Sequence, residues 1–193
     1  MLPEDDTVTV LKTLLRRILA LEVPVGCLLL DKGFAGIETM QYLSTQRLCA
    51  IIACPIRGKK GPHPGGTRAL CQGRKSYSTQ YTFRNSKTSQ TAEVAVCRVF
   101  TTARRTGRMP RRAAWLIFIV IGPELAGLSP RAVRRLYRQR FGVETSYRCA
   151  GLDHLAERGL PVRALGPELF YGQRVGASVL VLHAGAASWK TMV

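Results

Sequence analysis

The order of helical and extended segments in the first 53 residues constrains the fold more than any other feature of the sequence. Apolar residues recur every three or four positions over 8–19, which predicts an amphipathic helix. The apolar runs 25–30 and 48–53 have the length of buried strands, and a second helical pattern at 37–43 lies between them. A helix between two strands allows the strands to pair in parallel. We therefore expect an α/β fold with a partly parallel sheet and helices on its faces.

A different pattern follows the second strand. A loop rich in glycine, proline and lysine spans 57–66, and β-branched and aromatic stretches at 77–84, 93–101 and 114–121 are separated by turn-rich segments. These stretches predict an antiparallel, β-rich insertion. Trp115 is expected to be buried in the last strand because apolar residues follow it.

The next strong signal is the start of a helix at Ser129 and Pro130. A serine hydroxyl can cap the first helical turn, and proline suits the first helical position because its missing amide hydrogen would have no partner there. The helix is expected to run to about residue 148. Beyond residue 151 the apolar pieces are interrupted by glycine and proline, and no element is predicted.

Positive charge is concentrated in two stretches of the chain. The 193 residues include 29 Lys and Arg against 12 Asp and Glu, a net charge of +17. Residues 57–112 hold 14 basic residues and one acid, and residues 129–148 hold six arginines and one acid. Repulsion at this density destabilises a fold unless bound anions offset it. Nucleic acid is therefore the expected partner.

Other classes of protein fit the sequence poorly. The longest apolar run, 113–121, has nine residues, whereas a membrane-spanning helix needs about 20. Acidic residues at 4–6 stand where a signal peptide carries basic ones. The six cysteines form no Cys-x-x-Cys pair, which predicts buried, reduced thiols in a cytoplasmic protein rather than a metal cluster.

Two carboxylates are placed where they could take part in chemistry. Asp31 ends an apolar strand before a glycine-containing turn, and ligands of α/β proteins bind at the carboxyl ends of parallel strands. Capping of the turn is an equally good interpretation of Asp31. Glu144 shares a helical face with Tyr137 and Arg140, and a surface ion pair with Arg140 is the alternative there. Together, Asp31 and Glu144 make sense as Mg²⁺ ligands at a site that acts on phosphates.

Two segments resemble DDE transposases of bacterial insertion sequences. The stretch Leu-Leu-Leu-Asp-Lys-Gly-Phe at 28–34 is similar to the second-aspartate segment of that family. Tyr137, Arg140 and Glu144 match the first three positions of the signature Tyr-x2-Arg-x3-Glu-x6-Lys in the third-carboxylate helix of one group. A β-rich insertion between the two segments also occurs in that group. The resemblance covers about residues 1–150.

The resemblance implies a partial ribonuclease H-like fold and Mg²⁺-dependent cleavage and strand transfer at transposon ends. Asp31 would be the second catalytic carboxylate and Glu144 the third, and in intact relatives such residues hold two Mg²⁺ ions. Tyr137 and Arg140 would contact or position DNA, while water and then a DNA 3′-hydroxyl act as nucleophile. The implied partners are DNA and either a second copy of the chain, as a homodimer on DNA, or an intact transposase. The implied location is the bacterial cytoplasm near the nucleoid.

The same resemblance divides the chain into four parts. Residues 1–56 and 123–150 would form the ribonuclease H-like core, with the basic β-rich insertion at 57–122 between them. The remaining part is an atypical tail, 151–193, for which a frameshift shortly after residue 148 is the hypothesis.

The sequence departs from the family pattern at three points. The family's first aspartate lies on a strand upstream of the segment before Asp31, and the chain starts too late to include it. Gly151 stands where the signature has lysine, and the tail lacks the family's aromatic-rich helix. We therefore expect a transposase fragment that binds DNA without cleaving it alone, and a sheet with an exposed edge.

A non-catalytic, basic nucleic-acid-binding protein is the second hypothesis. It would bind through the β-rich insertion, as a passive binder or as an inhibitor of an intact transposase. Its affinity would fall steeply with salt on any DNA, whereas a transposase fragment would follow transposon-end sequence. A ribosome- or RNA-associated protein ranks last, because exposed aromatic residues are not interleaved at a recognisable RNA-binding spacing.

Overall fold

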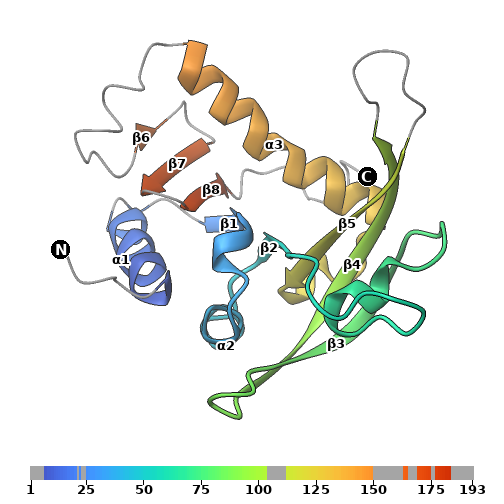
Figure 1. Ribbon diagram of the computed structural model, residues 1–193. Coiled ribbons are helices and arrows are strands. Elements are labelled where there is room, and N and C mark those ends of the chain that lie inside the picture. The colour runs from blue at the N-terminus through green and yellow to red at the C-terminus, as the bar shows by residue number, and fades with distance from the viewer. Residues whose placement is uncertain are drawn as a thin grey trace.

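The computed structural model describes most of residues 7–149 and three short strands beyond them (Figure 1). The described residues are 7–20, 22, 25–103, 112–149, 163–164, 169–174 and 177–183, with the backbone alone for 103, 112–113, 141–149 and those after 150. The helices and strands are α1 (Thr7–Leu19), β1 (Val25–Leu30), α2 (Ile37–Thr45), β2 (Ala50–Ala53), β3 (Tyr77–Arg84), β4 (Thr91–Ala103), β5 (Arg112–Ile121), α3 (Pro130–Cys149), β6 (Arg163–Ala164), β7 (Leu169–Arg174) and β8 (Ala177–His183). Short 3₁₀ turns lie at Lys32–Phe34, Gly66–Cys71 and Pro123–Leu125.

One mixed sheet runs through the molecule, in the strand order β3–β4–β5–β2–β1–β8–β7–β6. β1 and β2 pair in parallel, with Leu29 opposite Ile51. The other pairings between described strands are antiparallel. The expected α/β protein with a partly parallel sheet is confirmed. The strands of the basic segment continue this sheet, because β5 pairs with β2.

Helices cover both faces of the β1–β2 part of the sheet (Figure 1). Leu28 and Leu30 of β1 pack on one face with residues of α1 and α2, including Leu11. Cys27 and Leu29 pack on the opposite face with residues of α3. Successive side chains of a strand point to opposite faces, so a strand covered on both sides is apolar at every position. This explains the uninterrupted apolar runs in the sequence.

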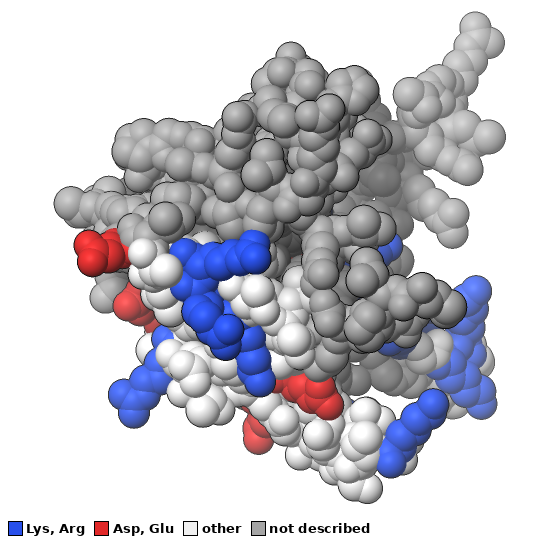
Figure 2. Space-filling model, turned by 90° about the vertical axis from the view of Figure 1, so that its left-hand side faces the viewer, with Lys and Arg blue, Asp and Glu red and all other residues white. Residues whose placement is uncertain are grey.

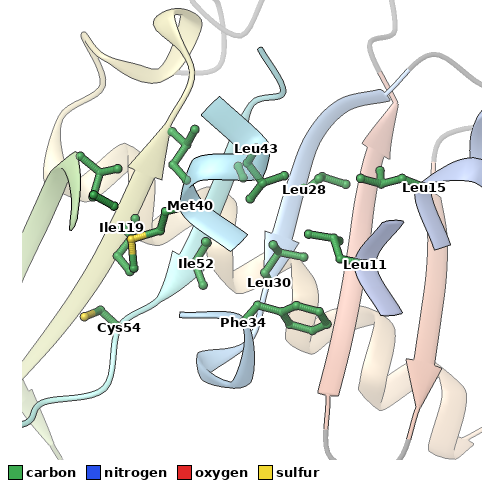
Figure 3. Packing of buried hydrophobic residues seen from close by; sticks show 14 of the residues in the cluster. Leu11, Leu15, Leu28, Leu30, Phe34, Met40, Leu43, Ile52, Cys54 and Ile119 are labelled. Atoms are coloured by element: carbon green, nitrogen blue, oxygen red, sulfur yellow. The ribbon is translucent and has the colours of Figure 1, made fainter. Parts of the chain in front are cut away.

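The larger part of the core lies between the sheet and the two N-terminal helices. Figure 3 shows Leu11 and Leu15 of α1 beside β1, and Met40 and Leu43 of α2 over the strands next to it. These four side chains are almost fully buried. Burying one such side chain stabilises a fold by roughly 1.5–3 kcal/mol. Spacing of three and four residues along α1 and α2 is what brings these side chains onto one face.

The α3 helix begins where the sequence predicts. The hydroxyl oxygen of Ser129 accepts a hydrogen bond from the backbone N–H of Ala132 at 3.3 Å, and Pro130 is the first helical residue. None of the helices within the described ranges is both long and apolar enough to cross a membrane.

The tail differs from the expectation. No element was predicted beyond residue 151, yet β8 pairs antiparallel with β1, with Leu180 opposite Leu29. β1 is therefore an inner strand of the described sheet, whose edge strands are β3 and β6. The physical reason is that 177–183 is a short apolar run, too brief for a periodicity argument, whose backbone groups pair with those of the neighbouring strand.

Candidate functional site

A cleft of about 840 Å³ lies where β1 and β2 end, beside α3. Residues at and beyond the ends of these two strands line the cleft, together with residues 115–118 of β5. Four side chains of α3 line the remaining wall, namely Arg134, Tyr137, Arg138 and Arg140. The carboxyl ends of parallel strands are the usual ligand-binding edge of an α/β sheet.

Asp31 enters this cleft from the end of β1. It is half-buried, and its Oδ1 atom accepts a hydrogen bond from the backbone N–H of Gly33 at 2.6 Å. This bond caps the 3₁₀ turn Lys32–Phe34. Asp31 therefore combines the two features that the sequence left as alternatives, because it caps a turn and also lines the cleft.

Tyr137 attaches α3 to the same end of β1. Its hydroxyl donates a hydrogen bond to the carbonyl oxygen of Leu30 at 3.2 Å, across 107 residues of sequence. The side chain is 5% exposed, and its ring centre lies 4.9 Å from that of Phe118. Because Leu30 directly precedes Asp31, this bond positions the helix beside the carboxylate.

Arg140 places a buried positive charge in the wall of the cleft. Its side chain is 8% exposed, and its guanidinium carbon lies 5.7 Å from the ring centre of Tyr137. A cation near the face of an aromatic ring gains electrostatic stabilisation, which helps to offset the cost of burial. The cleft thus brings together Asp31, Tyr137 and Arg140, three of the four site residues predicted from the sequence.

The fourth predicted residue, Glu144, belongs to α3, one turn beyond Arg140. Its side chain lies outside the described residues. Asp31 is the single carboxylate in the lining of the cleft as described. Over the described ranges, no group of three His, Cys, Asp or Glu side chains could hold a metal ion. One carboxylate is too few for two Mg²⁺ ions, so the described side chains do not by themselves fit that pair.

Positive charge dominates the described lining of the cleft. Lys32 and the three α3 arginines face one carboxylate, that of Asp31. Apolar neighbours such as Phe118 lower the local dielectric constant and strengthen the field of these cations. Figure 2 shows a different face of the molecule, on the side of α1, where acidic and basic side chains lie near one another. The cleft is therefore suited to an anionic ligand.

Trp115 is a cleft residue that the sequence did not identify. The prediction that it is buried is wrong, because it is half-buried and lines the cleft. Its Nε1–H donates to the carbonyl oxygen of Gly73 at 3.0 Å, and buried Arg98 donates to the same oxygen. Trp115 lies near the start of β5, before the segment of that strand that packs in the core. Strand propensity alone does not distinguish the partly exposed start of β5 from the part of the strand that is buried in the core.

Cys54 also lines the cleft, without the properties of a nucleophile. Burial raises the pKa of its thiol to about 12, although the charge of nearby Arg57 acts in the opposite direction. The thiolate is the reactive form of cysteine, and a thiol with this pKa is protonated at neutral pH.

The described site is thus a basic cleft with one capped carboxylate at the end of a parallel strand. Its chemistry favours holding an anion over metal-dependent catalysis by the described side chains alone. Comparisons with protein-family models, with curated proteins and with solved structures find no match to this chain.

Proposed function

We propose that this chain is a DNA-binding protein related to DDE transposases, and that the cleft beside α3 holds the DNA. One observation carries the proposal. Asp31 and the pair Tyr137 and Arg140 come from two segments that separately resemble the family, and they line the same cleft. If the two resemblances were chance matches, there would be no physical reason for the residues of both segments to line the same cleft.

A partial ribonuclease H-like core forms part of this proposal. In its support, β1 and β2 are parallel neighbours, Asp31 follows the first of them, and α3 packs against the sheet beside it. The β-rich segment between Asp31 and α3 agrees with the insertion that the resemblance implies.

The proposal assigns DNA binding to this chain and strand cleavage and transfer to relatives with a complete set of carboxylates. In those relatives, residues equivalent to Asp31 and Glu144 would hold Mg²⁺. A complete site of this kind needs three carboxylates and the sequence supplies two, Asp31 and Glu144, so we expect no Mg²⁺-dependent nicking by this chain alone. Nicking that Asp31→Asn abolishes would overturn this expectation.

DNA binding by the purified chain tests the proposal, with fluorescence anisotropy of a labelled duplex as the measurement. Arg138→Glu reverses an exposed charge in the cleft, and Arg84→Glu makes the same change at the exposed end of β3, away from the cleft. We expect Arg138→Glu to weaken binding by about tenfold or more at about 0.1 M salt, and Arg84→Glu by less than about threefold. Equal losses would mean that the cleft is not the binding site, and a wild-type chain that does not bind would exclude the function.

A non-catalytic, basic nucleic-acid-binding protein is the second candidate, favoured by the cationic residues that line the cleft. The same anisotropy assay distinguishes this second candidate function from the first. A duplex with the terminal sequences that flank the gene is compared with a scrambled duplex of equal length. Preference for the terminal sequences supports the relationship to transposases. Equal affinities that depend only on salt, and are shared by duplex RNA, support the second candidate.

A further inference from the structure

A second pocket lies next to the cleft, beside a basic loop formed by residues 57–68. Its volume is about 380 Å³, and its lining includes Lys60, Arg68 and Trp115. Ile56 and Trp115 line both this pocket and the cleft, so the two are adjacent. The pocket lies outside the set of residues that the resemblance to transposases singles out.

The side chain of Thr67 joins the two ends of the basic loop by hydrogen bonds. This residue is 6% exposed, its hydroxyl donates to the carbonyl oxygen of Pro55 at 2.8 Å, and its oxygen accepts from the backbone N–H of Arg57 at 2.8 Å. The backbone N–H of Arg68 also donates to the carbonyl oxygen of Arg57 at 2.9 Å. The loop is therefore closed at its base by hydrogen bonds from a buried side chain and from the backbone.

Gly58 lets the two arms of the loop approach closely. Its φ of +117° favours glycine, and a Cβ atom built there would lie 1.9 Å from the carbonyl oxygen of Gly65. The carbonyl oxygen of Gly58 in turn accepts a hydrogen bond from Nε of Arg68 at 3.1 Å. This bond fixes the guanidinium group of Arg68 beside the pocket.

The charges of the pocket are of one sign. Lys60 and Arg68 are cationic, and the described lining contains no acidic residue. Holding a cationic side chain in place before binding reduces the entropy lost when an anion binds. Ammonium and guanidinium groups both donate hydrogen bonds to phosphate oxygens. A closed loop that holds the guanidinium group of Arg68 and carries Lys60 beside a pocket is therefore suited to a phosphate.

We propose that this pocket is a phosphate-binding subsite for a DNA strand that leaves the cleft past Trp115. The inference rests on the proposed function and extends it beyond the cleft. Lys60 and Arg68 contact a phosphodiester group of the strand whose neighbouring nucleotides occupy the cleft. The hydrogen bond from Trp115 to Gly73 holds in place the wall that the two pockets share.

Salt-dependent DNA binding tests the subsite. Lys60→Gln removes a charge at the pocket, and Lys87→Gln removes the same charge at the exposed turn between β3 and β4. At about 0.1 M salt we expect Lys60→Gln to weaken binding by about fivefold to tenfold, and to lower the slope of log affinity against log salt by about 1. Lys87→Gln is expected to leave the affinity within about twofold of wild type.

A second pair of variants tests whether closure of the basic loop contributes to DNA binding. Gly58→Ala forces the loop open, whereas Gly127→Ala, outside the lining of both the pocket and the cleft, meets no atom within 4 Å and should leave DNA binding unchanged. We expect Gly58→Ala to weaken DNA binding as Lys60→Gln does, and the double variant to be no weaker than either, because both remove the same contact. Circular dichroism checks that both glycine variants fold.

The outcomes separate the two proposals. A wild-type chain that does not bind DNA excludes the proposed function. If Arg138→Glu weakens binding but Lys60→Gln does not, the subsite is excluded and the cleft remains. Equal effects of Lys60→Gln and Lys87→Gln also exclude the subsite. The loss of affinity would then follow from the lower net charge alone and not from a contact at the pocket.

Discussion

The hydroxyl of Tyr137 donates a hydrogen bond to the carbonyl oxygen of Leu30, joining α3 to the last residue of β1. Asp31 is the next residue, and its side chain caps the turn that follows. One bond between segments 107 residues apart thus holds the arginines of α3 opposite the carboxylate at the end of the strand. This attachment adds to the packing of α3 on the sheet in forming the basic cleft.

Removing the hydroxyl should destabilise the fold. Tyr137→Phe deletes the donor to Leu30, and loss of one buried hydrogen bond costs about 1 kcal/mol. Urea unfolding followed by circular dichroism measures the change. Tyr42→Phe, at a half-buried position of α2, is the control and should change stability by less than about 0.5 kcal/mol. Equal stabilities of the two variants would contradict the role given to this bond.

The charge of Asp31 and its capping bond can be separated by two substitutions. Asp31→Asn keeps an oxygen that can accept from Gly33 but removes the negative charge, so stability should hold and DNA affinity should rise by about twofold or more. Asp31→Ala also removes the cap, which costs about 0.5–2 kcal/mol. Anisotropy titrations in EDTA and thermal melts measure the two effects. Weaker DNA binding by the asparagine variant in EDTA would show that the carboxylate does not repel the ligand.

The buried face of α1 should contribute far more stability than its exposed face. Leu11 is 0% exposed in the core, whereas Leu19 at the end of the same helix is 57% exposed. Leu11→Ala should lower the free energy of unfolding by about 2–5 kcal/mol because it leaves a cavity. Leu19→Ala should change it by less than about 0.5 kcal/mol. Chemical denaturation of both variants checks this difference, and similar losses would mean that α1 is not packed on β1.

Alkaline pH should destabilise the fold through its buried thiols. The pKa of Cys54 is raised from its ordinary value of 9.0 to about 12, chiefly by burial. Above pH 9 the unfolded chain loses this proton while the folded chain keeps it. The stability linked to this thiol is therefore fully present below pH 9 and is lost as the pH rises from 9 toward 12, by about 1 kcal/mol over the first pH unit.

Urea unfolding under reducing conditions, from about pH 8 to about pH 10, measures this loss. Cys54→Val removes the titrating group and keeps an apolar side chain at the position. The variant should lose less stability over this range than the wild type. Parallel pH profiles would show that Cys54 does not carry the effect.

The sequence by itself predicted the α-helices and strands that the structure describes between residues 7 and 149. A helix repeats every 3.6 residues and a strand every two, so the pattern of apolar residues reports the local backbone directly. The same holds for the cap at Ser129, since a capping side chain and its N–H partner lie within one turn. Asp31 at the end of β1, and Tyr137 and Arg140 on α3, were placed correctly along the chain for this reason.

Only the tertiary structure decided which of these segments meet. The bond from Tyr137 to Leu30, the pairing of β8 with β1 and the half-exposed position of Trp115 each depend on partners far away in the sequence. Several apolar runs have the composition of a strand, and local patterning does not say which of them pair. The closure of the basic loop by Thr67 also depends on the tertiary structure. Its hydroxyl closes the loop only because the fold places it between the carbonyl oxygen of Pro55 and the backbone N–H of Arg57. Local periodicity is set by neighbouring residues, whereas the cleft results from how strands and helices share the buried space.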